Sequence, residues 1–287
     1  MLIVVIYDSH GGHTYGLLNP DTVIEAIDME GNTYQYCPPL TEIQKHLWYN
    51  ITVPALEATK ELAWKSPVAV LSGGDITHGN GFKEELVTTR ISDQKFIAEA
   101  NFLPFIELKN TNYARFVKGT GVHEFGEGSA SIEVAGLFQR RFPKKDIKAL
   151  YHGLLNIEGY EIDYSHHGPT PGKRNWLKGN EARYYLRSLM MDELSLGKSP
   201  ANLVLRGHYH DPVKEYLSID WNGSEYESWL YILPSMSFPN DFAVKATKSQ
   251  YIVTTGIVIF EIINSKLFKT YKFATRLDIR TKEIFKL

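Results

Sequence analysis

The chain has 287 residues, of which 43% are hydrophobic and 22% are charged. This composition is typical of a globular protein and excludes a collagen-like or disordered chain. Lysine and arginine number 31 against 33 aspartates and glutamates, so no net charge attracts the protein to nucleic acid or to an anionic membrane. The single cysteine, Cys37, excludes an intramolecular disulfide and a zinc site built from cysteines. Histidine and carboxylate side chains therefore remain as the strong metal ligands.

Short β-branched runs alternate with longer amphipathic segments, which predicts an α/β protein with a buried sheet. Five early strands are predicted at residues 2–7, 67–72, 114–118, 160–165 and 201–206. Helices are predicted at residues 41–64, with Pro54 as a kink or break, and at 84–101, 129–142 and 179–196. Later strands are predicted at residues 229–233, 251–263 and 267–273. We expect a single domain over residues 1–287, in which the strands of about 217–287 complete a second sheet.

The apolar run at the start of the chain does not read as a targeting segment. It covers only residues 2–7, ends at Asp8, and has no basic region before it. A run this short is neither a signal peptide nor a membrane span. We expect a cytoplasmic protein without a membrane partner.

Each of the five early strands is followed at once by a polar cluster that contains histidine or aspartate. The clusters are Asp8-Ser9-His10, Gly73-Gly74-Asp75, Gly119-Thr120-Gly121-Val122-His123-Glu124, His166-His167-Gly168-Pro169 and Gly207-His208-Tyr209-His210. In an open α/β sheet, ligands bind beyond the carboxyl ends of the strands. The five clusters should therefore meet in one crevice, and their recurrence argues against a purely structural role for all of them.

The spacing within two of the clusters is suited to metal binding. The side chains of Asp8 and His10, and of His208 and His210, are two residues apart, so they point the same way from an extended segment. Imidazole and carboxylate together suit Mn, Fe, Zn, Ni or Co better than Ca or Mg alone. Two adjacent ions stabilise the attacking and leaving oxygens of a phosphoryl displacement. These residues predict a two-ion site for phosphate-ester chemistry.

We call the five polar clusters blocks one to five, in chain order. In this order they resemble the sequence blocks of the calcineurin-like metallophosphoesterase superfamily. The amino-acid sequence around Asp8, His123 and His210 is similar to that of superfamily members found in bacteriophages and prophages. The resemblance spans residues 8–210. It implies a four-layer α/β sandwich of two mixed β-sheets flanked by helices, and hydrolysis of a phosphate ester by a metal-bridging hydroxide. It also implies two divalent metal ions, with manganese as the first expectation and iron, zinc, nickel and cobalt as alternatives.

The same resemblance assigns residues to the two metal positions. The first position is formed by Asp8, His10 and His210. Asp75 bridges to the second position, which His208 and a histidine of the fourth block complete. His167 is the first choice for that ligand because it directly precedes the Gly-Pro turn, and His166 is the alternative.

Four further residues are assigned to catalysis or substrate binding. The resemblance implies that His123, beside the bridging Asp75, stabilises the phosphate or protonates the leaving group, a task suited to histidine near pH 7. Glu124 would orient His123 or contact the substrate. His78, in the loop after Asp75, either contacts the substrate or is an ordinary polar loop residue. Arg174, in a basic run after the fourth block, is a candidate contact to a nucleic-acid backbone, with a solvated surface as the alternative.

One position departs from the superfamily pattern. An asparagine usually precedes the third-block histidine and binds the second metal, whereas this chain has Val122 there. Thr120, a water molecule or another oxygen must replace that ligand, or the second ion binds weakly. A phosphodiester, DNA and RNA included, is the first substrate expectation. The alternatives are a phosphomonoesterase acting on a small metabolite or phosphoprotein, and a metal-binding module without catalytic activity; the oligomeric state stays open.

Overall fold

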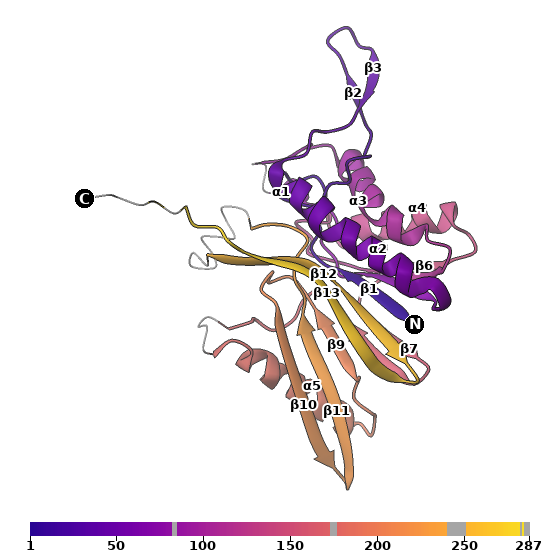
Figure 1. Ribbon diagram of the computed structural model, residues 1–287, viewed down its shortest axis with the longest axis vertical. Coiled ribbons are helices and arrows are strands. Elements are labelled where there is room, and N and C mark those ends of the chain that lie inside the picture. Colours follow the sequence, from indigo (N-terminus) through magenta and orange to yellow (C-terminus); the bar gives the residue numbers. More distant parts are fainter. Residues whose placement is uncertain (82–84, 173–176, 240–250, 282, 284–287) are drawn as a thin grey trace.

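Two mixed β-sheets form the centre of the computed structural model, which describes residues 1–81, 85–172, 177–239, 251–281 and 283 (Figure 1). The first sheet contains, in spatial order, β13 (Lys266–Asp278), β12 (Ile252–Ile263), β1 (Leu2–Ile6), β4 (Val68–Ser72), β5 (Thr111–Val117) and β6 (Asp146–Leu150). The second contains β10 (Val213–Trp221), β11 (Ser224–Ile232), β9 (Leu203–Arg206), β8 (Tyr160–Tyr164) and β7 (Gly153–Ile157). In the first sheet β1, β4, β5 and β6 are parallel, and in the second β8, β9 and β11 are parallel.

The two sheets pack face to face through alternate residues of their strands. Ile3 and Val5 of β1 contribute to a buried cluster with Ile162 of β8 and Leu205 of β9. Residues of β1 between them, such as Val4, belong to a different cluster on the opposite face. Because successive side chains of a strand point to opposite faces, β1 contributes to both clusters and is buried on both sides.

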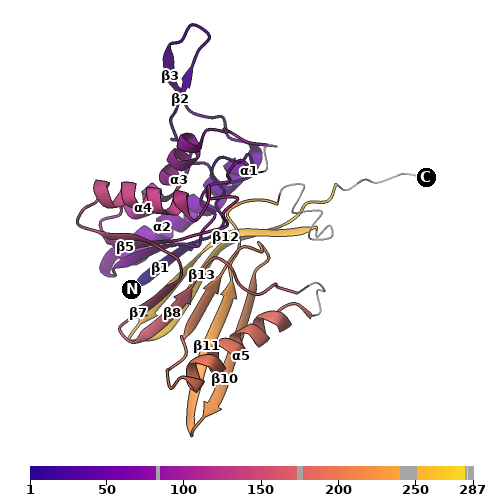
Figure 2. The ribbon, with the colours of Figure 1, turned by 180° about the vertical axis from the view of Figure 1, so that it is seen from behind.

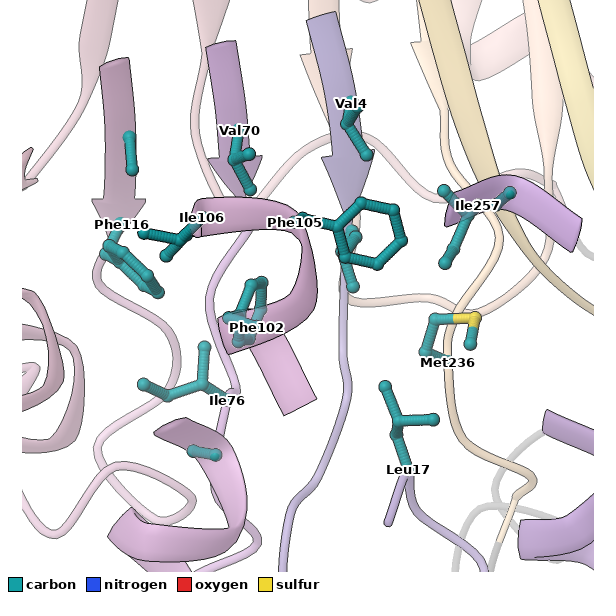
Figure 3. Close-up of a cluster of buried hydrophobic side chains, with 14 of the residues drawn as sticks. Val4, Leu17, Val70, Ile76, Phe102, Phe105, Ile106, Phe116, Met236 and Ile257 are labelled. Atoms are coloured by element: carbon teal, nitrogen blue, oxygen red, sulfur yellow. The ribbon is translucent and has the colours of Figure 1, made fainter. Parts of the chain in front are cut away.

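Helices cover the outer face of each sheet. The first sheet is covered by α1 (Glu42–Lys45), a π-helical segment (His46–Thr52), α2 (Val53–Leu62), a 3-10 turn (Ala63–Lys65), α3 (Ile91–Ile106) and α4 (Ser129–Arg141). Phe102 and Phe105 of α3 fill the layer between helices and sheet (Figure 3). On the second sheet, α5 (Asn180–Ser195) packs Leu186 and Met190 against Val204 (Figure 2). The expected four-layer sandwich is confirmed, and none of the described helices is long and apolar enough to cross a membrane.

A two-stranded hairpin of β2 (Ile24–Ile27) and β3 (Thr33–Tyr36) projects away from both sheets (Figures 1 and 2). The sequence did not predict these strands. All four residues of β3 are exposed, and only Ile24 of β2 is buried. The hairpin therefore lacks the apolar run by which the predicted strands were recognised; β6, β7 and β10 were not predicted either.

Several predicted elements differ from the structure. The expectation that residues 217–287 complete the second sheet is wrong for β12 and β13, which belong to the first sheet; only β10 and β11 join the second. β12 pairs with β1, from Leu2 opposite Glu261 to Val5 opposite Val258, and this pairing buries its long apolar run. The helix predicted from residue 84 begins at Ile91 and extends to Ile106. The helix predicted at residues 41–64 is divided into α1, the π-helical segment and α2, and Pro54 lies in the first turn of α2, directly after the π-helical segment.

Candidate metal centre

The five polar blocks lie at one edge of the molecule, beyond the carboxyl ends of β1, β4 and β5 in the first sheet and of β8 and β9 in the second. Contacts between the blocks cross from sheet to sheet. The backbone N–H of His208 donates to Asp8 Oδ2 at 3.2 Å, and His166 Nε2 lies 3.1 Å from Asp75 Oδ2. The blocks therefore converge as expected, although their strands belong to two sheets rather than to one.

The first predicted metal position is assembled as a group of three donors. Asp8, His10 and His210 each offer one ligand atom, and these atoms lie within 4.8 Å of one another. His210 Nε2 is 3.6 Å from Asp8 Oδ1, and Asp8 and His10 are buried. Asp8 Oδ1 is buried without a hydrogen-bond partner among the described residues. A buried carboxylate oxygen left in this state fits a cation, because an unpaired buried charge is costly.

The second position is centred on His166. Its Nε2 lies 3.1 Å from Asp75 Oδ2 and 3.2 Å from His208 Nδ1. Its Nδ1 lies 2.8 Å from the carbonyl oxygen of Gly73, and because a carbonyl only accepts, Nδ1 must donate. This hydrogen bond orients the ring so that Nε2 faces the carboxylate, as is usual for metal-binding histidines.

The structure distinguishes the two fourth-block histidines. His166 is buried between the two carboxylates, and it groups with Asp8 and Asp75 as a possible ligand set. His167 is exposed, and its ring centroid lies 4.6 Å from that of His208. His166, the alternative in the sequence analysis, therefore takes the inner position, and the first choice, His167, lies at the rim of the same donor group.

The charges of the centre are strongly coupled. Burial opposes ionisation of Asp75, but the neighbouring His166 outweighs it and lowers the pKa of the carboxyl group. Burial also opposes protonation of His166, yet Asp75 and Asp8 raise its pKa to about 9. Burial and the surrounding imidazoles lower the pKa of His10 well below its usual range, so this ring is neutral, as a metal ligand must be. Together the two carboxylates stabilise positive charge at the centre, whether it is a proton or a metal ion.

Five candidate ligands have left-handed backbone conformations. Their φ angles are 52° at Asp8, 43° at His10, 49° at Asp75, 72° at His208 and 54° at His210. Such conformations are uncommon for residues other than glycine and cost energy. They persist where the surrounding structure holds them, and they cluster at functional sites. Their concentration in three of the five blocks supports a functional role for this edge.

Tyr7 contacts the strand ends that precede the fourth and fifth blocks. The sequence did not predict this role. The Tyr7 hydroxyl lies 3.1 Å from the carbonyl oxygen of Ser165 and 3.2 Å from that of Leu205, and it donates to them. A Cβ atom at Gly73 or Gly207 would come within 2.0 Å of its ring. The glycines of the second and fifth blocks therefore leave room for Tyr7. An aromatic residue just before Asp8 was the only available signal.

The third block contributes His123 but no second-metal ligand at position 122. His123 Nδ1 donates to the carbonyl oxygen of His78 at 2.7 Å. Val122 is 47% exposed, and its Cγ2 would lie 2.6 Å from a Cβ atom at Gly81, so its side chain packs beside that glycine. The Thr120 hydroxyl, 2.9 Å from Asp75 Oδ1, is the oxygen that the sequence analysis offered as a replacement.

The remaining predicted residues have different surroundings. Glu124 is fully buried and accepts hydrogen bonds from the Gly119 N–H and the Ser131 hydroxyl, both at 2.9 Å, so it lies behind the site rather than facing a substrate. Burial and the nearby Asp75 raise its pKa to about 7. His78 is buried beside His10 and His123. Arg174 lies outside the described residues.

No protein-family model and no curated protein sequence matches the chain. Among solved structures, it is similar to Vps29 from Chaetomium thermophilum, with a TM-score of 0.32 and 11% identity over 99% of this chain and 97% of that one. It is also similar to a metallophosphoesterase from Sphaerobacter thermophilus, with a TM-score of 0.33 and 13% identity over 98% and 90% of the two chains. Likeness at this level carries no argument about function, which rests on the centre itself.

Proposed function

We propose that the protein is a metal-dependent phosphoesterase of the calcineurin-like type and that its substrate is a phosphodiester, DNA and RNA included. The observation that carries the proposal is the pair of adjoining donor groups, Asp8 with His10 and His210, and Asp8 with Asp75 and His166. Asp8 belongs to both groups, so two ions held there would be neighbours. Adjacent divalent ions are a recurring arrangement in phosphoryl hydrolysis.

The donor set decides which ions fit. His208 and His167 extend the second group, so imidazoles outnumber carboxylates at the centre. Such a mixture suits Mn, Fe, Zn, Ni or Co, and manganese is our first expectation. When bound, such ions polarise a phosphoryl oxygen and lower the pKa of water. The protein holds the donor side chains in place. His166 donates a hydrogen bond to the Gly73 carbonyl, and Asp75 accepts one from the Thr120 N–H.

His123 is the proposed proton carrier. Its Nδ1 donates to the carbonyl oxygen of His78, which fixes the ring and directs Nε2 away from that carbonyl. The ring centroid lies 4.5 Å from that of His10, so His123 stands beside the first donor group. An imidazole in this place can give a proton to the oxygen that leaves phosphorus.

Tyr209 supports a diester rather than a monoester. It lies between His208 and His210, is 37% exposed, and its ring centroid is 5.1 Å from that of His208. A diester carries a second organic group, and an exposed aromatic face beside the centre can stack on it or on a nucleic-acid base. Residues 140–145, a second basic run near the end of α4, offer no such support at Arg141, which pairs with Glu99, or at Lys145, which donates to backbone carbonyls.

The test is hydrolysis of bis-(p-nitrophenyl) phosphate and of p-nitrophenyl phosphate by metal-stripped protein resupplied with Mn, Ni, Zn or Mg. We expect metal-dependent cleavage of the diester. His123→Ala should abolish turnover while metal content, measured by elemental analysis, is retained. His152→Ala is the matched control, because His152 pairs with Asp163 at the surface of the second sheet. Preference for the monoester would instead favour a phosphomonoesterase, and an unchanged rate in His123→Ala would refute its role.

A second candidate function follows from Val122. Because this residue packs beside Gly81 and supplies no ligand, the second ion has one donor fewer than the superfamily pattern provides. Protein that binds one ion or none and hydrolyses neither ester would favour a binding module without catalytic activity. Protein that binds two ions and is inactive on both esters would point to an enzyme of narrow specificity.

A further inference from the structure

A third group of donors lies beside the first metal position. His10 follows β1, His78 lies in the loop after β4, and His123 lies in the loop after β5. Each offers one ring nitrogen, and the three nitrogens lie within 4.8 Å of one another. The ring centroids are separated by 4.5 Å for His10 and His123, 5.0 Å for His78 and His123, and 5.3 Å for His10 and His78.

The nitrogen atoms have the spacing of ligands to one ion. His10 Nδ1 and His78 Nδ1 lie 3.3 Å apart and share a hydrogen bond. An ion bound by both nitrogens would replace that hydrogen, with the proton of each neutral ring on Nε2. Two imidazole nitrogens bound to one tetrahedral zinc ion, each at about 2.0–2.1 Å, are about 3.3–3.4 Å apart. For His123, Nδ1 donates to the carbonyl oxygen of His78, so Nε2 is the ring nitrogen that an ion would bind.

The loops that carry these rings are fastened to one another. The His78 N–H donates to the Gly11 carbonyl at 3.1 Å, and the Thr77 hydroxyl donates to the His123 carbonyl at 2.7 Å. On the far side, the His13 ring packs against His78 with centroids 4.2 Å apart. Three imidazoles from separate parts of the chain are thus held together by contacts that do not depend on a metal ion.

We propose that His10, His78 and His123 form a three-imidazole site for Zn²⁺ or a similar late transition-metal ion, and that this site shares His10 with the first metal position. The site contains no carboxylate, and imidazole ligands favour Zn, Cu and Ni, whereas Mn favours oxygen ligands. This chemistry distinguishes it from the neighbouring carboxylate-containing groups. A fourth ligand can come from water, as in other zinc sites with three histidines.

The site competes with the hydrolytic centre for His10. A neutral imidazole has one lone pair, so His10 binds an ion either with Asp8 and His210 or with His78 and His123. Zinc at the three-imidazole site therefore removes a ligand from the first metal position and occupies His123. Inhibition of a manganese-loaded enzyme by zinc follows, and this consequence alone rests on the proposed function.

The first test uses the wild-type protein and zinc alone. Crystals of manganese-loaded protein are soaked in Zn²⁺, and anomalous scattering at the zinc edge locates the ion. We expect a zinc peak between the rings of His10, His78 and His123. Zinc found only among the carboxylate-containing groups, with none between these three rings, would overturn the proposal.

The second test uses zinc titration calorimetry on His78→Ala and His152→Ala. We expect the zinc-binding step assigned to the three-imidazole site to weaken by at least about tenfold in His78→Ala, because losing a ligand costs at least as much as losing its supporting contact. His152→Ala should bind zinc as the wild type does. Equal zinc binding in His78→Ala and wild type would contradict the proposal.

The two proposals fail separately. Zinc bound by the three rings in a protein that hydrolyses neither nitrophenyl ester would retain the three-imidazole site while the proposed diester hydrolysis fails its own test. Ester hydrolysis without zinc between the rings would support the hydrolase function and exclude the three-imidazole site.

Discussion

At the residue scale, the Tyr7 ring occupies the space that side chains would need at Gly73 and Gly207. Gly73→Ala would place a Cβ atom 2.0 Å from the ring, so ring or backbone must move. We expect the free energy of unfolding to fall by about 1–3 kcal/mol, the usual cost of overpacking a core. Urea denaturation measures this change. Gly136→Ala is the control: its Cβ would meet only the end of Arg140, so it should stabilise α4 by about 0.5–1 kcal/mol.

Thr120 is a second residue whose role can be measured. Its hydroxyl and its backbone N–H both donate to Asp75 Oδ1, at 2.9 and 2.6 Å. Thr120→Val removes the hydroxyl and retains the shape and the N–H. We expect metal affinity, measured by competition with a chelator, to fall by about tenfold or more, the usual cost of losing a supporting hydrogen bond. Thr120→Ser should retain the metal affinity of the wild type. Equal metal affinity in Thr120→Val and wild type would show that the hydroxyl does not support Asp75 as a ligand.

The candidate ligands could be predicted from the sequence because each directly follows a recognisable apolar strand. Tyr7 could not, since its role depends on two glycines more than sixty residues away. The sequence also could not predict that His166, rather than His167, takes the inner position. Its hydrogen bond to the Gly73 carbonyl joins segments 93 residues apart, and nothing local separates it from His167.

At the element scale, β8 and β9 are joined by an ion pair between a fully buried arginine and an aspartate whose side chain is 21% exposed. Arg206 is fully buried, and its Nη1 lies 2.5 Å from Asp163 Oδ1. Asp163→Ala leaves the guanidinium without that charge partner, so we expect about 3–5 kcal/mol of destabilisation in urea denaturation. Glu42→Gln, which breaks the exposed pair with Lys45, should cause no measurable change. A loss in Asp163→Ala no larger than in Glu42→Gln would contradict the assigned importance of the pair.

Most of the strands that the sequence predicted have continuous apolar character, as β1 and β12 do, whereas β8 alternates apolar and polar residues. Their partners were not revealed, because β12 has the same kind of apolar run whether it pairs with β1 or with a strand of the second sheet. The β2–β3 hairpin shows the reverse case. Its pairing of Ile24 with Tyr36 is regular, yet its exposed residues carry no burial pattern. The periodicity of apolar residues therefore predicts which side chains are buried. It predicts a strand only where the strand is also buried.

At the scale of the whole molecule, the candidate centre is where the two sheets meet. Asp8 and Asp75 come from the first sheet, and His166 and His210 come from the second. The order of the blocks along the chain predicted that they converge. It did not predict that the crevice lies between two sheets, because the same order fits five parallel neighbours in a single sheet.

With metal ions bound as we propose, the stability of the whole molecule should depend on metal. An ion bound by ligands from both sheets binds the folded protein and not the separated strands, so it shifts the unfolding equilibrium. At a free metal concentration 100 times the dissociation constant, the gain is about 2.7 kcal/mol. We expect Mn²⁺ or Zn²⁺ to raise the melting temperature of chelator-treated protein by several degrees in differential scanning calorimetry. Asp8→Asn should remove most of that increase, because Asp8 belongs to both donor groups, whereas His152→Ala should retain it. An equal increase in Asp8→Asn and wild type would mean that the ions bind elsewhere, and the two sheets would then be linked at this centre by protein contacts such as those of Tyr7 and of His166 with Gly73.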